Sequence, residues 1–259
     1  IKIIPDFGPA HLSMGICYTE LGRYKDALAK IKEALKLDKN LVVEANYRFG
    51  EVYTKLKDIK KAIKHYKEAI SVDPSAAMPN LRLGMLYFKL KKYEDAVEPL
   101  RKSIKQSPKY AAEGYFRLGT SLMKLKRYKL AEEPLRKAVE LSPDNEVAND
   151  ALADNLFQLS SFLGVDAKPG EKVDLLREVT FYNPEHIEAH EQLSSAYDEI
   201  LNGTKAINHC IIVQRFLVEN KMMKQLAKSR ESLQALYKKY KMGPEDFRKV
   251  ITPRKNYHH

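Results

Sequence analysis

The sequence is poor in the residues that several protein classes need. It has no tryptophan, only 11 glycines and 12 prolines among 259 residues, and two cysteines, Cys17 and Cys210, that form no CxxC pair. A disulfide scaffold and a cysteine-rich zinc site are therefore excluded. No apolar run reaches the roughly 18 residues that a transmembrane helix needs. The sequence predicts no membrane span.

Motifs for catalysis are missing as well. The chain contains no GxGxxG, GxxxxGKS, GxxxxGKT, GxSxG or HExxH, the patterns that cradle phosphates, activate a nucleophile or hold zinc. His186 and His190 stand four residues apart beside several glutamates and could meet one metal on a helix face. His190 also occupies a packing position of the repeat described below, and we interpret it as packed. The sequence thus indicates no enzyme, no metal and no cofactor.

The abundant residues favour helix. Hydrophobic residues make up 44% and charged residues 31% of the chain, and leucine, alanine, lysine and glutamate, which are strong helix formers, are frequent. The net charge is +11, and residues 221–259 carry +8 of it, with eleven Lys or Arg against three acidic residues. We therefore expect an all-α protein with a basic C-terminal end.

A sequence pattern returns at an almost constant period. Four glycines are separated by 35, 34 and 35 residues: Gly15, Gly50, Gly84 and Gly119. An alanine follows each glycine after twelve residues, and a large apolar residue follows the alanine after four: Ala27 and Ile31, Ala62 and Tyr66, Ala96 and Leu100, Ala131 and Leu135. Prolines close three of these units: Pro74, Pro108 and Pro143. Such a period predicts a stack of similar helical hairpins.

This pattern resembles the tetratricopeptide repeat family, whose unit of 34 residues is a pair of antiparallel helices. The glycine and alanine positions fit places where two helices cross closely, and proline stops the second helix. The tryptophan of the family pattern is replaced throughout, which should weaken the packing of single repeats. Its position holds His11, Asn46, Asn80, Tyr115, Asn149 and His190. The resemblance implies an all-α, right-handed superhelical solenoid of about six helix-turn-helix hairpins.

The later units depart from the regular pattern. The fifth closes at Pro184, 41 residues after Pro143, so seven residues are inserted, and we place them around residues 160–170 between its two helices. The insertion is either functional or a tolerated surface loop. The sixth unit is followed by a helix over residues 221–241 with apolar residues on one face, as a capping helix needs.

These observations predict four segments. Residues 1–7 resemble the end of a preceding repeat, because Pro5 stands 34 residues before the place where the first unit should close. Residues 8–220 form the repeat array, residues 221–242 the capping helix and residues 243–259 a basic tail. We expect this tail to be poorly ordered or held only by contacts from Phe247, Val250 and Ile251. The sequence does not indicate a cellular compartment.

The resemblance also indicates a binding groove, because the first helix of each hairpin lines the concave wall in this family. Basic residues recur at two groove positions of repeats two to four: Arg48, Arg82 and Arg117 at one, and Lys55, Lys89 and Lys124 at the other. Large apolar side chains that hairpin packing does not demand accompany them: Tyr47, Leu81, Met85, Phe88 and Phe116. We expect this surface to bind a partner segment that carries apolar anchors and acidic residues. The alternative is that the charged rows are a solvated helix face.

The functional hypothesis is a non-catalytic scaffold or adaptor that binds a protein or peptide segment and supports the assembly of a multiprotein complex. The carboxylate clamp known in the family is not expected, because its positions hold Leu12, Ile16 and Arg48. Repeats five and six place acidic residues on the corresponding face, which would meet a basic ligand or the basic tail. Two alternatives remain: the tail contacts nucleic acid or another anionic surface, or the array is the binding arm of a larger enzyme. The few aromatic residues beside the tail do not favour nucleic-acid readout.

Overall fold

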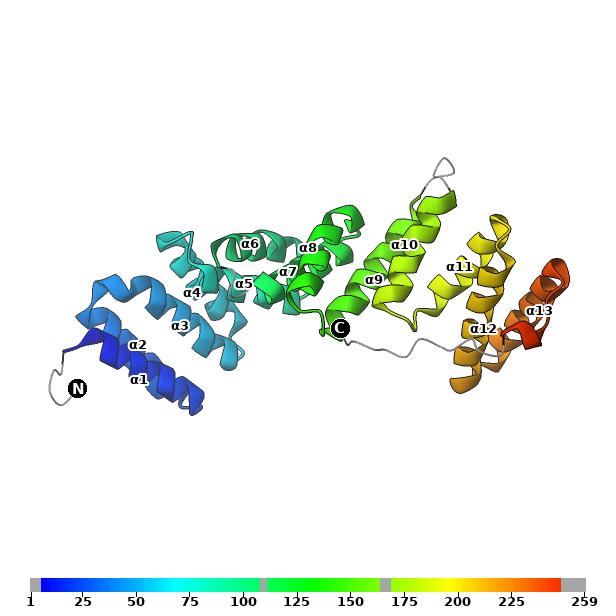
Figure 1. Ribbon diagram of the computed structural model, residues 1–259. Coiled ribbons are helices and arrows are strands. Elements are labelled where there is room, and N and C mark those ends of the chain that lie inside the picture. The colour runs from blue at the N-terminus through cyan, green and yellow to red at the C-terminus, as the bar shows by residue number, and fades with distance from the viewer. Residues whose placement is uncertain (1–5, 108–110, 164–168, 248–259) are drawn as a thin grey trace. The chain divides into compact units, whose positions relative to one another are not determined.

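The computed structural model describes residues 6–107, 111–163 and 169–247. These residues form thirteen α-helices and no strand (Figure 1), as the sequence predicts. None of the helices in the described ranges is long and apolar enough to cross a membrane. The chain divides into two compact units, Ile1–Lys126 and Arg127–His259.

In its described residues the first unit has seven α-helices, of which the first six pair in chain order. They are α1 (Gly8–Glu20), α2 (Tyr24–Leu37), α3 (Val42–Lys55), α4 (Ile59–Val72), α5 (Ala77–Lys89), α6 (Tyr93–Gln106) and α7 (Ala111–Lys124), with a 3-10 turn, η1 (Lys39–Leu41), before α3. The pairs α1 and α2, α3 and α4, and α5 and α6 have the most extensive contacts. Three hairpins therefore match three predicted repeats, and α7 opens the fourth.

The second unit contains six α-helices. They are α8 (Tyr128–Leu141), α9 (Glu146–Ser161), α10 (Pro169–Tyr182), α11 (Ile187–Glu199), α12 (Gly203–Glu219) and α13 (Met223–Tyr240), followed by a 3-10 turn, η3 (Pro244–Phe247). Helices α9 and α10 form one hairpin and α11 and α12 the next, and α13 packs on α12. Phe247 is buried, with its ring centroid 6.0 Å from that of Tyr237. The predictions for Val250, Ile251 and the rest of the tail concern residues 248–259, which lie outside the described ranges.

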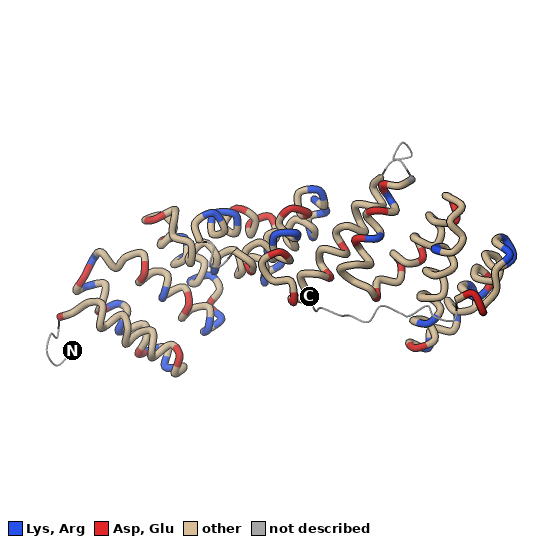
Figure 2. Tube along the Cα trace, viewed as in Figure 1, with Lys and Arg blue, Asp and Glu red and all other residues tan. Residues whose placement is uncertain are grey.

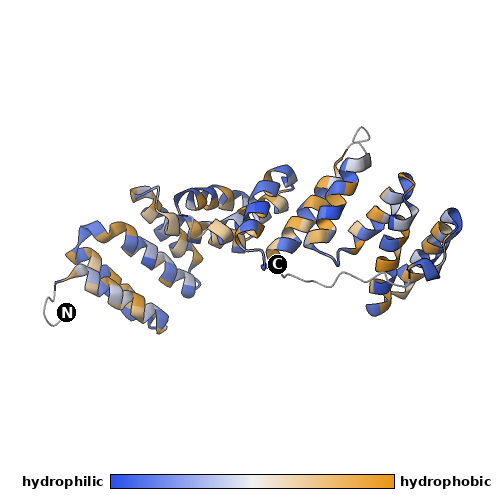
Figure 3. Cartoon of the chain, viewed as in Figure 1, coloured by the Kyte–Doolittle hydropathy of each residue, from blue (hydrophilic) through white to orange (hydrophobic). Residues whose placement is uncertain are grey.

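The glycine positions hold the hairpins closely together. A Cβ atom at Gly84 would lie 2.6 Å from Cγ of Leu100, and one at Gly15 would lie 2.6 Å from Cγ1 of Ile31. Both partners are fully buried. Each helix carries hydrophobic and hydrophilic residues (Figure 3), and the hydrophobic stripe of one helix covers that of its partner. The recurring glycines are thus explained by close contact between the two helices of a hairpin.

The residues that replace the family tryptophan have a role that sequence reasoning missed. Asn149 donates Nδ2–H to the carbonyl of Pro143 at 2.8 Å, and Asn80 donates to the carbonyl of Ala76 at 2.8 Å and, more weakly, to that of Pro74 at 3.3 Å. Both side chains are buried. They satisfy carbonyls in the closing turn, and unpaired buried carbonyls would be costly. Asparagine in place of tryptophan thus provides less apolar contact area but adds hydrogen bonds to the backbone before the helix.

The insertion in the fifth unit is shared between helix and connection. Helix α9 has 16 residues, whereas α7 has 14. Helix α10 begins only at Pro169. Residues 164–168 of the connection lie outside the described ranges. At least part of the insertion therefore extends the first helix of the hairpin.

Several hairpin turns contain a lysine in the left-handed backbone region. Lys57, Lys91 and Lys126 have φ of 60°, 59° and 59°, and Gly22 has φ of 73° at the same place in the first hairpin. At this position the next residue's N–H returns to the last helical turn, as Lys92 N does to the Tyr87 carbonyl at 2.9 Å. Glycine is usual here because a Cβ atom disfavours positive φ.

We expect Lys91→Gly to raise the free energy of unfolding by about 0.5–1 kcal/mol, the backbone strain relieved less the extra entropy of the unfolded chain. Urea denaturation followed by circular dichroism measures the change. Gly22→Lys is the matched reverse variant and should lower the free energy of unfolding by a similar amount. A loss on Lys91→Gly would show that the lysine side chain contributes more than its backbone strain costs.

Candidate functional site

A pocket of about 320 Å³ opens in the first unit, where residues from α3, α4, α5 and α7 meet. Five of the residues predicted from the sequence line it: Arg82, Met85, Phe88, Lys89 and Arg117. Thr54, Tyr66 and Leu86 complete the wall. Arg82, Met85, Leu86 and Lys89 are spaced by three, four and seven residues, so one face of α5 supplies them. Helix α7 contacts α5 and brings Arg117 to the opposite side. The pocket thus combines three cations with an apolar surface.

Arg82 is a partly satisfied cation of the pocket. Its Nη2 lies 3.5 Å from Oε1 of Glu51. This distance is longer than the roughly 2.7–2.9 Å of a charge-assisted hydrogen bond. Its Nε atom is buried and has no hydrogen-bond partner. A guanidinium group can donate five hydrogen bonds in a planar fork. Much of this capacity is unused beside the pocket.

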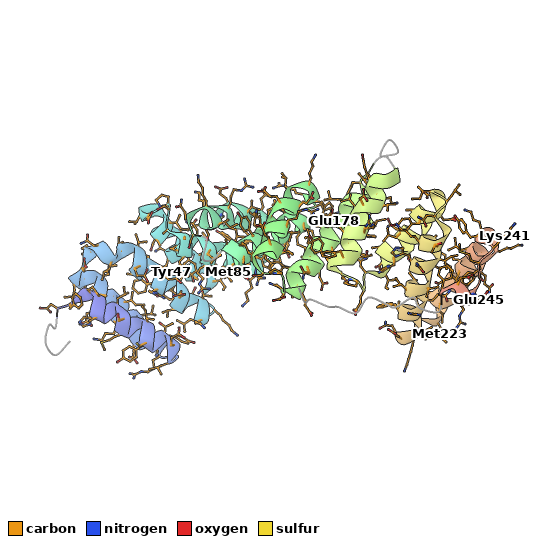
Figure 4. The ribbon with its side chains drawn as sticks, in the orientation of Figure 1. Tyr47, Met85, Glu178, Met223, Lys241 and Glu245 are labelled. Atoms are coloured by element: carbon orange, nitrogen blue, oxygen red, sulfur yellow. The ribbon has the colours of Figure 1, made fainter. Side chains whose placement is uncertain are left out.

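Glu51 lies at the centre of a polar network behind Arg82. Tyr47 donates its hydroxyl to Oε1 of Glu51 at 2.8 Å, and Arg48 donates Nη1–H to Oε2 at 2.8 Å. Burial raises the pKa of Tyr47 well above its usual range, so this hydroxyl stays protonated and remains a donor. Figure 4 places Tyr47 on α3 and Met85 on α5. The carboxylate of Glu51 is thus shared among three donors, and Arg82 makes the longest of the three contacts.

Arg117 is held by different contacts. Its Nε donates to Oε1 of Glu113 at 2.7 Å. Its guanidinium carbon lies 4.9 Å from the ring centroid of Phe88 and 5.3 Å from that of Phe116, within range of cation–π attraction. These contacts fix the direction of Arg117 and leave its remaining donors for a ligand.

The floor of the pocket is a tyrosine that belongs to the hairpin core. Tyr66 is 2% exposed, and its hydroxyl lies 3.3 Å from Oγ1 of Thr54. Burial raises the pKa of Tyr66 to about 12. Its hydroxyl therefore acts as a neutral hydrogen-bonding group.

The remaining predicted residues do not join this pocket. Tyr47 and Leu81 are each 3% exposed, so their side chains are buried in the array and do not form open groove surface. Arg48 is held by two carboxylates, with Nε 2.7 Å from Glu44 Oε1 in addition to its bond to Glu51. Lys55 and Lys124 are exposed near the ends of α3 and α7.

Residues that sequence reasoning did not assign to the site are Thr54, Tyr66, Leu86 and Glu51. Tyr66 was recognised only as a packing residue. Leu86 follows Arg82 by four residues, a spacing that could have placed it on the same face. Nothing in the one-letter pattern distinguishes Glu51 from other exposed acids.

The two histidines considered as metal ligands have structural roles. His186 is the N-cap of α11, where its Nδ1 accepts a hydrogen bond from Ala189 N–H at 3.2 Å. Nε2 of His190 contacts the Pro184 carbonyl at 3.0 Å, and Nδ1 contacts Nδ1 of His209 at 2.8 Å. Both ring nitrogens of His190 are therefore engaged. In the part of the chain that the structure describes, no group of three or more His, Cys, Asp or Glu residues is placed to hold a metal ion.

Comparison with known proteins agrees with this architecture. Models described as tetratricopeptide repeat match residues 8–41, 80–110 and 112–145, and one described as TPR repeat matches residues 50–91. A comparison with curated proteins gave no match.

Solved structures show the same fold. YrrB, described as a TPR protein with an unusual peptide-binding site, is 21% identical, with a TM-score of 0.56 over 76% of this chain and 97% of its own. MamA is 22% identical, with a TM-score of 0.52 over 68% of this chain and 96% of its own. Repeats of this kind are protein-interaction modules, typically without enzymatic activity. The repeat models and the helical hairpins together establish that this chain belongs to the tetratricopeptide repeat family and is an interaction scaffold.

Proposed function

We propose that the pocket between α5 and α7 binds an acidic segment of a partner protein, with an apolar side chain of that segment against Met85 and Phe88. The observation that carries the proposal is Arg82, whose Nε is buried without a partner beside the pocket. A carboxylate there would complete the fork of the guanidinium. Arg117 and Lys89 line the same pocket and add attraction for negative charge.

The apolar part of the pocket supports the same ligand. Met85, Leu86 and Phe88 lie among the cations, and methionine adapts its shape to different side chains. An acidic segment with one leucine or phenylalanine would therefore gain both apolar burial and charge-assisted hydrogen bonds. The fold of YrrB is similar, and that protein has a peptide-binding site. Binding of a protein segment is the function that we infer for this unit.

A synthetic peptide with a leucine and a phenylalanine flanked by glutamates tests the proposal by fluorescence anisotropy. We expect Arg82→Glu to weaken binding roughly ten- to hundredfold, because a charge-assisted hydrogen bond contributes about 1.5–3 kcal/mol. Phe88→Ala should also weaken binding. Circular dichroism should show unchanged helicity.

Two exposed residues provide matched controls. Arg101 on α6 is exposed and does not line the pocket, so Arg101→Glu should leave affinity unchanged. Lys238→Glu on α13 tests the alternative in which the basic C-terminal end attracts anions. If Lys238→Glu abolished binding while Arg82→Glu and Phe88→Ala left it intact, the pocket assignment would be wrong.

A further inference from the structure

The second unit contains another cavity, of about 620 Å³, between helices of opposite charge. Helix α11 carries four acidic residues and no Lys or Arg, whereas α13 carries five Lys or Arg and one glutamate. Figure 2 shows acidic positions on α11 and basic positions along α13. Both helices line the cavity, and α12 contributes Cys210 and Val213.

The charges on these walls do not neutralise one another across the cavity. Glu191 and Glu199 line it from α11, Lys228 from α13 and Lys172 from α10. No ion pair within 4.0 Å joins these four side chains to one another in the described ranges. The cavity therefore keeps separated positive and negative groups facing it.

Helices α11 and α13 contact each other outside the cavity. Asp198 of α11 accepts hydrogen bonds from Lys239 Nζ and from the Tyr240 hydroxyl, both at 2.7 Å. This contact ties α11 to the last turn of α13. It lies outside the set of residues that line the cavity, so the charges that face the cavity stay unpaired while the two helices are held in place.

The cavity also contains polar groups that lack partners. Ser229 is 8% exposed, and its Oγ has no hydrogen-bond partner. Oε1 of Gln192 is likewise buried without a partner. Both residues line the cavity. A ligand that offers hydrogen-bond donors and acceptors would satisfy them, and a peptide main chain offers both at every residue.

We propose that this cavity binds an extended peptide segment of alternating charge, with its basic side chains toward α11 and its acidic side chains toward α13. Successive side chains of an extended chain point to opposite sides, so one segment can satisfy two walls of opposite sign. The main chain of the peptide would form hydrogen bonds with Ser229 and Gln192. This site is independent of the pocket in the first unit, because it selects a pattern of charges and not an acidic segment.

An eight-residue peptide of alternating lysine and glutamate is the probe, measured with the full chain by fluorescence anisotropy at low salt. We expect this peptide to bind, and a block peptide with four lysines followed by four glutamates to bind at least about fivefold more weakly. Glu199→Lys and Lys228→Glu should each weaken the alternating peptide roughly tenfold. Glu188→Gln and Lys224→Gln, on the same two helices but outside the cavity, should have no effect.

A variant with all four cavity-lining charges reversed separates charge recognition from damage to the fold: Lys172→Glu, Glu191→Lys, Glu199→Lys and Lys228→Glu. A shift of the peptide by one residue exchanges its two faces, so this fourfold variant should recover most of the affinity lost in either single variant. Three results would each overturn the proposal: no binding of the alternating peptide, equal binding of the block peptide, or no recovery in the fourfold variant. None of these results would affect the proposal for the first unit, which is tested by binding of the acidic peptide and by Arg82→Glu.

Discussion

Replacement of Leu100 by alanine is expected to lower the free energy of unfolding by about 2–5 kcal/mol. Leu100 is fully buried and lies against Gly84, where its side chain fills the space that a larger residue would occupy. Its removal forfeits the apolar contacts and leaves a cavity that two packed helices cannot close. Urea denaturation followed by circular dichroism measures this loss.

The opposite change tests the same contact from the other helix. Gly84→Ala adds a methyl group where a Cβ atom would lie 2.6 Å from Leu100 Cγ, and overpacking of this kind costs about 1–3 kcal/mol. In the double variant the new methyl group enters the space that Leu100 vacates. We therefore expect a combined loss smaller than the sum of the two single losses.

The matched control is Leu21→Ala, because Leu21 is 70% exposed in the same unit. This change should alter stability by less than about 0.5 kcal/mol. Strictly additive losses for Gly84→Ala and Leu100→Ala would show that the two positions do not share one space, and the explanation of the repeated glycine would then be wrong.

The contact between Gly84 and Leu100 also shows why the fold could be predicted from the sequence. The two residues are sixteen positions apart within one hairpin, and each of the first four repeats carries its own copy of such a pair. A period of about 34 residues therefore contains enough local information to define each hairpin. The hydrogen bonds of Asn80 and Asn149 were not predictable in the same way, because the family pattern has an apolar residue at that position.

The candidate site was predictable only in part, for a physical reason. Arg82, Met85 and Lys89 share one face of a single helix, so the groove positions that the family resemblance implies already placed them together. The burial of Tyr47 and Leu81 depends on neighbouring helices, and no spacing within one repeat reports it. Their binding role and that of the other predicted groove residues stays a prediction that the peptide experiment tests.

Acid is expected to destabilise the second unit through a pair of packed histidines, of which His190 is buried and His209 is partly buried. His190 Nε2 faces the Pro184 carbonyl and must carry the proton there, so its Nδ1 accepts a hydrogen bond from His209 Nδ1–H at 2.8 Å. His190 is therefore neutral in this arrangement. Burial lowers the pKa of His209 to about 4, helped by nearby His190 and Lys205, and burial also lowers the pKa of His190.

The sign of the effect follows from the folded and unfolded pKa values. Above a pH of about 6.5 the His209 ring is neutral in both the folded and the unfolded chain, so it contributes no pH dependence to stability. Between about 6.5 and 4 the unfolded chain binds a proton that the folded chain excludes, so stability falls as pH falls. Below about 4 the folded chain also binds the proton and the loss stops growing. For His209 the full loss is about 3 kcal/mol.

Carboxylates throughout the chain also titrate in acid, so the wild-type profile alone cannot isolate the histidines. His209→Gln keeps a side-chain N–H donor for His190 and removes the titrating ring. Urea denaturation of both proteins at several values between pH 7.5 and 4 gives the difference that belongs to His209. We expect the variant to lose less stability than the wild type over this range, because only the wild type must exclude the proton from a buried ring. Parallel stability profiles for the two proteins would show that the surroundings of His209, including the stacked ring of Tyr197 at 5.6 Å, accommodate the charged imidazole without cost.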